Sequence, residues 1–254
     1  MQNSAVLTAQ NLLLGYNERT VLENITFSVQ KGEIFGILGN SGCGKSTLLK
    51  HLIGLFTPKS GTISLLGENL DPSDSAAYAN QMTRVGVTYQ GGALFGSMTV
   101  AENVALPLEL HTDKSKEEIA SIVREKLSLV DLEDFGDFLP GELSGGMKKR
   151  AGLARAIVLE PQLLFFDEPS AGLDPLAAAG LDKLILSMRE KLGVTVVIVT
   201  HELDSIFAVT DRVAVIDKNE KTIVAEGNPY ELRDHSDNLF VRRFLNRDGL
   251  KGSL

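Results

Sequence analysis

The sequence lacks the features that would point to a disulfide framework, a nucleic-acid complex or a membrane span. Its only cysteine, Cys43, can form neither an internal disulfide nor a cysteine metal site. Acidic side chains outnumber basic ones by 33 to 25, and the formal charge of -8 argues against DNA or RNA as the main partner. The most apolar runs have the length of strands, whereas a bilayer span needs about twenty apolar residues.

The amino-terminal segment also lacks the basic and apolar regions of a secretory signal. The chain has 254 residues, of which 43% are hydrophobic and 23% charged, as is usual for a soluble globular protein. This length allows one large domain or two small ones. We therefore expect a folded, acidic, cytoplasmic protein that reaches a membrane only through a partner.

Short apolar runs alternate with segments of helical periodicity. Four runs are apolar at nearly every position, as parallel strands covered on both faces are: Ile34–Leu38, Val85–Tyr89, Leu163–Phe166 and Val194–Val199. Apolar residues at helical spacing predict helices over Lys45–Leu55 and Ala178–Leu192. This alternation indicates βαβ units, and hence an α/β protein with a mostly parallel sheet.

Three regions depart from this alternation. The first about thirty residues contain β-like stretches such as Leu22–Val29, which indicate an antiparallel sheet beside the core. The region from about residue 92 to 142 is polar and mainly helical, and the tail after Gly227 predicts one short amphipathic helix. We expect a single domain in which residues 1–91 and 143–227 form the core with its β-subdomain. Residues 92–142 would form a helical subdomain, and residues 228–254 a C-terminal tail.

The segment Gly39–Thr47 (GNSGCGKST) matches the phosphate-loop pattern G-x-x-x-x-G-K-[ST], with a predicted strand before it and a predicted helix after it. The glycines let successive backbone N–H groups face one hollow, and the helix N-terminus adds partial positive charge. Lys45 is expected to reach the β- and γ-phosphates, and the Ser46 hydroxyl to ligate Mg²⁺. The predicted nucleotide-binding residues of this loop are Gly39, Asn40, Ser41, Gly42, Cys43, Gly44, Lys45, Ser46 and Thr47.

Two adjacent carboxylates, Asp167 and Glu168, follow the predicted strand Leu163–Phe166. Groups at the carboxyl end of a strand in an open α/β sheet project into the ligand crevice. We expect Asp167 to hold Mg²⁺ through water and Glu168 to polarise the attacking water as a general base. Two carboxylates after an apolar strand are common by themselves, but a phosphate loop in the same chain favours the catalytic interpretation.

A third motif, Leu143–Met147 (LSGGM), resembles the signature of the ABC-type ATPases. Ser144, Gly145 and Gly146 stand at a predicted helix start, where a glycine-rich backbone favours a terminal phosphate. Met147 departs from the family pattern, in which glutamine is usual. The resemblance implies a P-loop, RecA-like core with an antiparallel β-subdomain and an inserted helical subdomain.

The same resemblance assigns roles to further residues. Tyr16 resembles the aromatic residue that stacks on adenine, although a tyrosine at a strand end more often serves packing. Gln90 matches the glutamine that links Mg²⁺ and the attacking water to the helical lobe. His201 matches the histidine that contacts the γ-phosphate, and Asp174 belongs to the loop that crosses between subunits.

The resemblance covers the chain to about Gly227 and implies an ATPase, with ATP and Mg²⁺ as cofactors, that works as a head-to-tail homodimer. ATP would be buried between the phosphate loop of one subunit and the signature of the other, so that binding closes the dimer and hydrolysis reopens it. One subunit would supply the catalytic residues and the metal ligands, and its partner the signature. The implied catalytic residues are Lys45, Gln90, Glu168 and His201; the implied metal ligands are Ser46, Gln90 and Asp167.

The segment from Gln90 to Leu108 (QGGALFGSMTVAENVALPL) closely resembles ATPases of the Mla/Mce/Tgd class, as does the LSGGM signature with Arg150. That class moves phospholipid or other lipid between bacterial membranes or into chloroplasts. It pairs two ATPases with two permease subunits and a ring of MCE-type lipid-binding proteins, sometimes with a small regulatory subunit. The resemblance implies a polytopic permease docked on the surface after Gln90, at the cytoplasmic face of the inner membrane.

The sequence leaves several alternatives open. Five apolar residues after Gln90 either form a groove for a permease helix or belong to the core of the lobe: Leu94, Phe95, Met98, Val100 and Val104. An importer ATPase for amino acids or other small polar solutes would share every catalytic residue. A soluble iron–sulfur assembly ATPase would keep the same motifs. DNA-repair and ribosome-acting ATPases fit less well, because the chain has no sustained heptads and one set of motifs.

Overall fold

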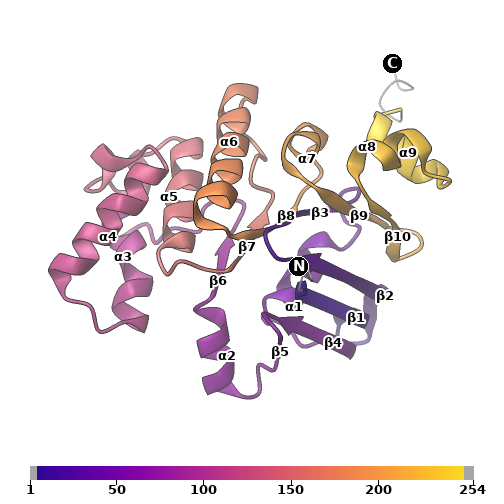
Figure 1. The fold of residues 1–254 in the computed structure, drawn as a ribbon, viewed down its shortest axis with the longest axis horizontal. Helices are drawn as coiled ribbons and strands as arrows, with labels where there is room; N and C mark the ends of the chain where they lie inside the picture. The colour runs from indigo at the N-terminus through magenta and orange to yellow at the C-terminus, as the bar shows by residue number, and fades with distance from the viewer. Residues whose placement is uncertain (1–4, 249–254) are drawn as a thin grey trace. The chain divides into compact units, whose positions relative to one another are not determined.

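The structure is a computed structural model that describes residues 5–248. The chain divides into two compact units, and Figure 1 labels the helices and strands of both. The first contains the residues up to Ala79 together with those from Thr195 onward, and the second contains Asn80–Val194. Each unit holds its own strands and its own share of the predicted site. The domain boundaries expected from the sequence stay a prediction.

The first unit contains the antiparallel sheet that the sequence predicts. Its strand order is β2-β1-β4-β5, with bounds Ala5–Tyr16 for β1, Arg19–Gln30 for β2, Ser60–Leu65 for β4 and Glu68–Asn69 for β5. The long strands β1 and β2 form a hairpin that closes at the pair Tyr16↔Arg19. Asn17 occupies the turn at φ 46, a left-handed conformation that asparagine adopts more readily than most residues.

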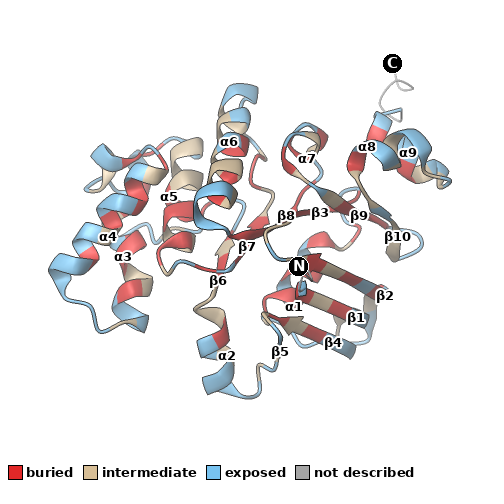
Figure 2. Cartoon of the chain, in the orientation of Figure 1, coloured by how far each residue is buried: buried red, intermediate tan, exposed pale blue. Residues whose placement is uncertain are grey.

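The same unit contains the buried strands that carry the phosphate loop. β3 (Ile34–Leu38) pairs in parallel with both β8 (Thr195–Val199) and β9 (Arg212–Asp217), and β9 pairs antiparallel with β10 (Thr222–Gly227). Every residue of β3 and β8 is buried, as Figure 2 shows, which explains why these runs are apolar throughout. The parallel pairing places the carboxyl ends of β3 and β8 at one edge.

Helix α1 (Lys45–Leu52) follows the phosphate loop, and α7 (Leu203–Val209) follows β8. α1 ends at Leu52 rather than at the predicted Leu55, because the chain turns at Gly54 with φ 72. A substituent at Gly54 would meet the ring of Tyr78, so glycine is required there on both counts.

The C-terminal region forms two helices, α8 (Pro229–His235) and α9 (Leu239–Asn246), where the sequence predicted one. α8 was missed because its seven residues have no apolar stripe; Asn228 caps its first turn and a proline follows. α9 is the predicted amphipathic helix. It buries Val241 and Leu245 in a cluster with residues of β3, α7 and β9.

The second unit contains a parallel strand pair and the predicted helical region. β6 (Val85–Thr88) pairs with β7 (Leu163–Asp167) in parallel from Val85↔Leu163 to Thr88↔Phe166. The helices are α3 (Val100–His111), α4 (Lys116–Leu129), α5 (Gly145–Ile157) and α6 (Pro175–Leu192), with α2 (Ser75–Met82) at the unit boundary and 3₁₀ turns at Glu133–Phe135 and Pro140–Glu142. The α/β fold with its antiparallel sheet and inserted helices is therefore confirmed.

Capping boxes start two of these helices, with Thr99 and Glu102 on α3 and Ser115 and Glu118 on α4. At 18 residues, α6 is the longest helix in the described part of the chain. Within residues 5–248 no helix has both the length and the apolar character needed to cross a bilayer.

A substitution at Gly86 in β6 tests how closely this strand packs against α5. β6 leads directly to Gln90. A Cβ at Gly86 would collide with the backbone oxygen of Ala156 in α5 and stand 2.7 Å from the side chain of Leu164. We expect Gly86→Ala to lower the free energy of unfolding by about 1–3 kcal/mol, because backbone atoms cannot move aside.

Gly96→Ala is the matched control, since the same methyl group would meet nothing within 4 Å there. Urea unfolding of both variants measures the difference. Equal stability of the two variants would contradict the tight contact between β6 and α5.

Candidate nucleotide site

The phosphate loop depends on glycine at two positions. Gly39 and Gly44 have φ values of 154 and 108, a region that L-residues with a side chain rarely adopt. A Cβ at Gly39 would lie 2.5 Å from Cys43 Sγ and 2.6 Å from the backbone oxygen of Ile216, and a Cβ at Gly44 would lie 2.9 Å from Leu22. Conformation and space thus both exclude larger residues, so the loop keeps the tight curl that a phosphate cradle needs.

Lys45 places its positive charge inside this loop. Its side chain is 6% exposed, and Nζ donates hydrogen bonds to the backbone oxygens of Gly39 at 2.7 Å and Asn40 at 3.4 Å. The neighbouring Ser46 is exposed. Burial raises the pKa of the Cys43 thiol, so the thiol stays neutral and adds no negative charge to the cradle. An anion entering the loop therefore meets a preplaced ammonium group.

Tyr16 lies at the end of β1 and belongs to an aromatic cluster. Its ring centroid is 5.1 Å from that of Phe56 and 6.4 Å from that of His51, and its hydroxyl donates to Thr47 Oγ1 at 3.3 Å. His51 is fully buried, and its Nδ1 lies 2.8 Å from the backbone oxygen of Thr47. Burial lowers the pKa of the His51 imidazole. The cluster gives the half-buried Tyr16 a packing role; its contact with adenine stays a prediction.

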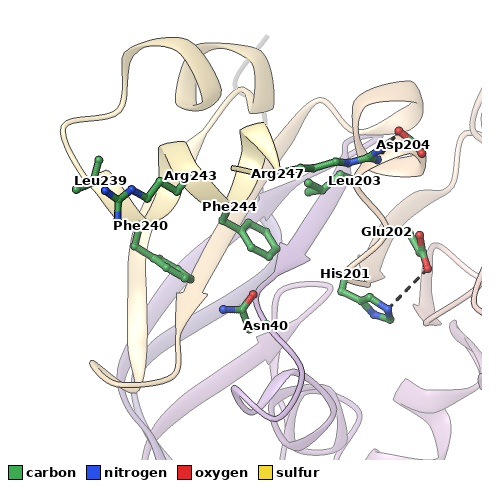
Figure 3. Close-up of a pocket in the computed structure, with 10 residues that line it drawn as sticks. All are labelled: Asn40, His201, Glu202, Leu203, Asp204, Leu239, Phe240, Arg243, Phe244 and Arg247. Carbon is green, nitrogen blue, oxygen red and sulfur yellow. Dashed lines mark hydrogen bonds and ion pairs between the residues drawn. The ribbon is translucent and has the colours of Figure 1, made fainter. Parts of the chain in front are cut away.

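His201 follows β8, at the edge that β3 and β8 share. Its side chain is 50% exposed, and Nε2 lies 3.7 Å from a carboxylate oxygen of Glu202. His201 and Asn40 line a pocket of about 900 Å³ together with residues of α9, and Figure 3 labels these lining residues. Phe240 and Phe244 of α9 stack there at 5.9 Å. The structure thus brings His201 and one residue of the phosphate loop, Asn40, to the same pocket in the first unit.

The other predicted catalytic side chains lie in the second unit. Asp167 is the last residue of β7, Glu168 follows it, and Gln90 is an exposed residue just beyond β6. Because β6 and β7 are parallel and in register, their carboxyl ends place Gln90 at the same edge as the two carboxylates. Glu168 has φ 49, a left-handed conformation that is uncommon outside glycine.

The signature segment forms the N-terminus of α5. The Ser144 side chain caps this helix by accepting a hydrogen bond from the Met147 N–H at 3.3 Å, and Gly145 and Gly146 form its first turn. Ser144 and Gly145 are exposed. Met147 thus stands at the third helical position and contributes its backbone to the cap. The motif therefore presents an accessible helix N-terminus that can bind an anion.

Asp174 has a structural role that the sequence did not predict. Its carboxylate caps α6 by accepting hydrogen bonds from Leu176 at 3.0 Å and Ala177 at 2.9 Å. Proline at the first position of this helix and the aspartate before it form a standard start signal. Its placement in the nucleotide site stays a prediction.

Three basic residues that follow the signature bind backbone oxygens within the second unit. Lys149 donates to Pro169 and Ala171, Arg155 to Gly92 and Ala93, and Arg150 to Val130, with a further short contact to Asp131. The sequence shows only a basic run on a helix, so these partners, which lie 19 to 63 residues away in the chain, could not be read from it.

The sequence left open whether the apolar residues after Gln90 form a groove for a permease helix or belong to the core of the lobe. The structure places some of them in the core and exposes another. Val100 and Val104 are fully buried in the helical lobe. Leu94 and Met98 are half-buried, and Phe95 is 53% exposed. Asn103 holds this loop by accepting from Phe95 N–H and donating to Phe95 O. A docking surface in this segment would therefore centre on Phe95.

The residues expected to hold Mg²⁺ fit that ion in chemistry. Ser46, Gln90 and Asp167 offer a hydroxyl, an amide and a carboxylate oxygen, and Mg²⁺ prefers oxygen ligands and keeps several waters. Residues 5–248 contain no group of three or more histidine, cysteine or acidic side chains that could hold a metal ion. Magnesium would supply charge neutralisation for bound phosphates.

The family model for ABC transporters matches residues 22–171, more than half of the chain. The chain is 41% identical to a probable ribonucleotide transport ATP-binding protein, Mkl of Mycobacterium leprae, over 97% of its length and 70% of the relative. It is 40% identical to the intermembrane phospholipid transport ATP-binding protein MlaF of Escherichia coli K12, over 91% of the chain and 84% of MlaF. It is also 41% identical to the methionine import protein MetN of Rhizobium meliloti, over 92% of the chain and 64% of MetN.

Among solved structures, a dimeric post-hydrolysis state of the ATP-binding cassette MJ0796 with ADP and Pi superposes with a TM-score of 0.79 and 27% identity, covering 87% of this chain and 98% of that one. The chain belongs to the ABC transporter ATP-binding family. It is an ATPase, and ATP is its nucleotide.

Lys45→Ala tests the role of the buried ammonium in the loop. Removing the cation leaves the cradle without its main charge, so we expect ATP affinity to fall by at least about tenfold, since charge-assisted hydrogen bonds contribute on the order of 1.5–3 kcal/mol. Isothermal titration with ATP and Mg²⁺ measures the change. Lys50→Ala, which removes an exposed lysine of the same helix, is the control. Unchanged affinity in Lys45→Ala would contradict the assignment of this loop.

Proposed function

We propose that two copies of this chain clamp Mg-ATP head to tail and drive a lipid-transport permease. The dimeric ADP and Pi state of MJ0796 supports the dimer, because this chain shares that cassette's fold and 27% of its sequence. In the proposed dimer, the phosphate loop of one subunit and the signature of its partner enclose one nucleotide.

The residues then divide the work of hydrolysis. The phosphate loop and Lys45 bind the phosphates, and Ser46, Gln90 and Asp167 hold the metal. Glu168 accepts a proton from the attacking water, and His201 contacts the γ-phosphate. Ser144 and Gly146 of the partner subunit complete the anion site through a helix N-terminus. Closure requires the negative triphosphate, so loss of phosphate removes the charge that holds the two subunits together.

Phospholipid or a related lipid is the proposed cargo. The single observation that carries this choice concerns the segment from Gln90 to Leu108. Its amino-acid sequence resembles that of the Mla/Mce class, and its Phe95 is exposed. MlaF, a phospholipid transport protein by name, aligns with 91% of the chain. We infer a polytopic permease on this surface, an MCE-type lipid-binding protein beyond it, and a peripheral position at the cytoplasmic face of the inner membrane.

An importer of a small polar solute is the second candidate. MetN, a methionine import protein by name, is as similar in sequence as the lipid and ribonucleotide proteins are. Both functions use the same catalytic residues, so they differ only in the permease and in the proteins that deliver cargo. Met147 and the segment after Gln90 favour the lipid transporter.

Glu168→Gln tests the proposed general base. The amide cannot accept the proton but keeps the shape of the side chain, so we expect ATP turnover to fall by about 10²–10⁴-fold while ATP binding persists. ATP should then hold the variant as a dimer, which size-exclusion chromatography with light scattering detects. Near-normal turnover would remove Glu168 from its assigned role.

Purification of the tagged chain from its native membrane tests the cargo assignment. Co-purification with a polytopic permease and an MCE-domain protein would support lipid transport, whereas a periplasmic solute-binding protein would support the importer. A soluble complex with iron–sulfur assembly factors would contradict both.

The same purification tests whether Phe95 is part of the surface that binds the permease. We expect Phe95→Asp to lose the permease, because a carboxylate cannot enter an apolar groove without a desolvation cost. Leu192→Asp makes the same chemical change at a 41% exposed leucine of α6 and should keep the permease. Retention of the permease by Phe95→Asp would place the docking surface elsewhere.

A further inference from the structure

The backbone at Glu168 is held in a conformation that its own sequence disfavours. Its φ of 49 lies in the left-handed region, and the next residue is Pro169. A proline ring clashes with compact conformations of the preceding residue and pushes it towards extended ones. Such a residue persists only where the surrounding structure fixes it. The loop that follows Glu168 therefore needs an anchor outside itself.

Lys149 supplies such an anchor from α5. Its half-buried ammonium donates hydrogen bonds to the backbone oxygen of Pro169 at 2.6 Å and to that of Ala171 at 2.5 Å. The two oxygens lie on either side of Ser170, so one cation fixes both sides of the turn. The Ala171 N–H also donates to the backbone oxygen of Glu168 at 3.3 Å. This hydrogen bond links the clamped turn directly to the backbone of Glu168. Hydrogen bonds from a charged donor are stronger than neutral ones.

The helix that carries Lys149 is itself fixed. Arg155, two turns further on, donates to the backbone oxygens of Gly92 at 3.0 Å and Ala93 at 2.8 Å. Gly92 touches α5 so closely that a Cβ at Gly152 would lie 2.8 Å from the Gly92 oxygen. α5 is thus a rigid support, and Lys149 connects it to the loop after Glu168.

We propose that Lys149 is a positioning residue for ATP hydrolysis: by clamping the Pro169 and Ala171 carbonyls, it holds the Glu168 carboxylate in its working orientation. The inference rests on the proposed role of Glu168 as general base. In this proposal Lys149 acts through the loop, by way of the Pro169 and Ala171 oxygens. It also joins the signature helix to the catalytic carboxylate within one subunit.

Lys149→Met removes both hydrogen bonds and keeps most of the side-chain volume. We expect kcat for ATP to fall about 10–100-fold, because a displacement of about 1 Å in a catalytic group has an effect of this size. KM for ATP should stay within about twofold, because the phosphate loop is untouched. Lys149→Arg keeps the charge and two donors and should recover most of kcat.

Lys183→Met is the matched control, because it removes the same charge from an exposed position on α6. It should keep the wild-type kcat. If Lys149→Met does not fold, Lys149→Gln replaces it, since its amide can still donate to one carbonyl. The kcat of Lys149→Gln should then lie between those of Lys149→Arg and Glu168→Gln.

A double-mutant cycle separates positioning from general damage. In a Glu168→Gln background, Lys149→Met should cause no further loss of turnover, because the carboxylate through which it acts is absent. If Lys149→Met lowers turnover in the Glu168→Gln background as much as it does in the wild type, the positioning role is wrong. It is also wrong if Lys149→Met keeps the wild-type kcat while Glu168→Gln is inactive. Either result leaves the proposed function intact. Wild-type turnover in Glu168→Gln would overturn the proposed function as well.

Discussion

The carboxyl ends of four buried parallel strands position the functional residues of this protein. The phosphate loop follows β3, His201 follows β8, Gln90 follows β6, and the Asp167–Glu168 pair closes β7. Each of these strands is covered by apolar side chains, so its backbone is fixed by burial and by its parallel partner. Charged and polar groups just past such ends are held firmly yet stay accessible to a ligand.

Helix α5 adds a second level of order inside the second unit. Its N-terminus presents the signature, while its basic side chains bind the backbone of the loops after Gln90 and Glu168. A helix that holds both loops gives them one common support. Lys149 and Arg155 thus have a structural task, and the part of the signature that can bind an anion is the helix N-terminus with its glycines.

Regular features were predictable from the sequence because they rest on local rules. Buried strands show as unbroken apolar runs, α4 and α6 show as stripes, and the phosphate loop shows through its glycines. α8 was not predictable because Asn228 and Pro229 signal a helix start but no apolar residues at helical spacing follow. The end of α1 was not predictable because it depends on the left-handed backbone of Gly54. The partners of Lys149 and Arg155, the cap formed by Asp174 and the left-handed Glu168 arise from tertiary contacts or backbone angles. A single sequence does not display these features.

The most direct test of a nucleotide site shared by two copies uses two inactive variants in a Glu168→Gln background. One carries Lys45→Ala and so lacks a working phosphate loop; the other carries Ser144→Arg and so lacks a working signature. If the site is shared, a mixed dimer contains one complete site and retains bound ATP through gel filtration, while neither homodimer does. If each subunit encloses its own nucleotide, mixing retains no more ATP than the separate variants, and the head-to-tail account is wrong.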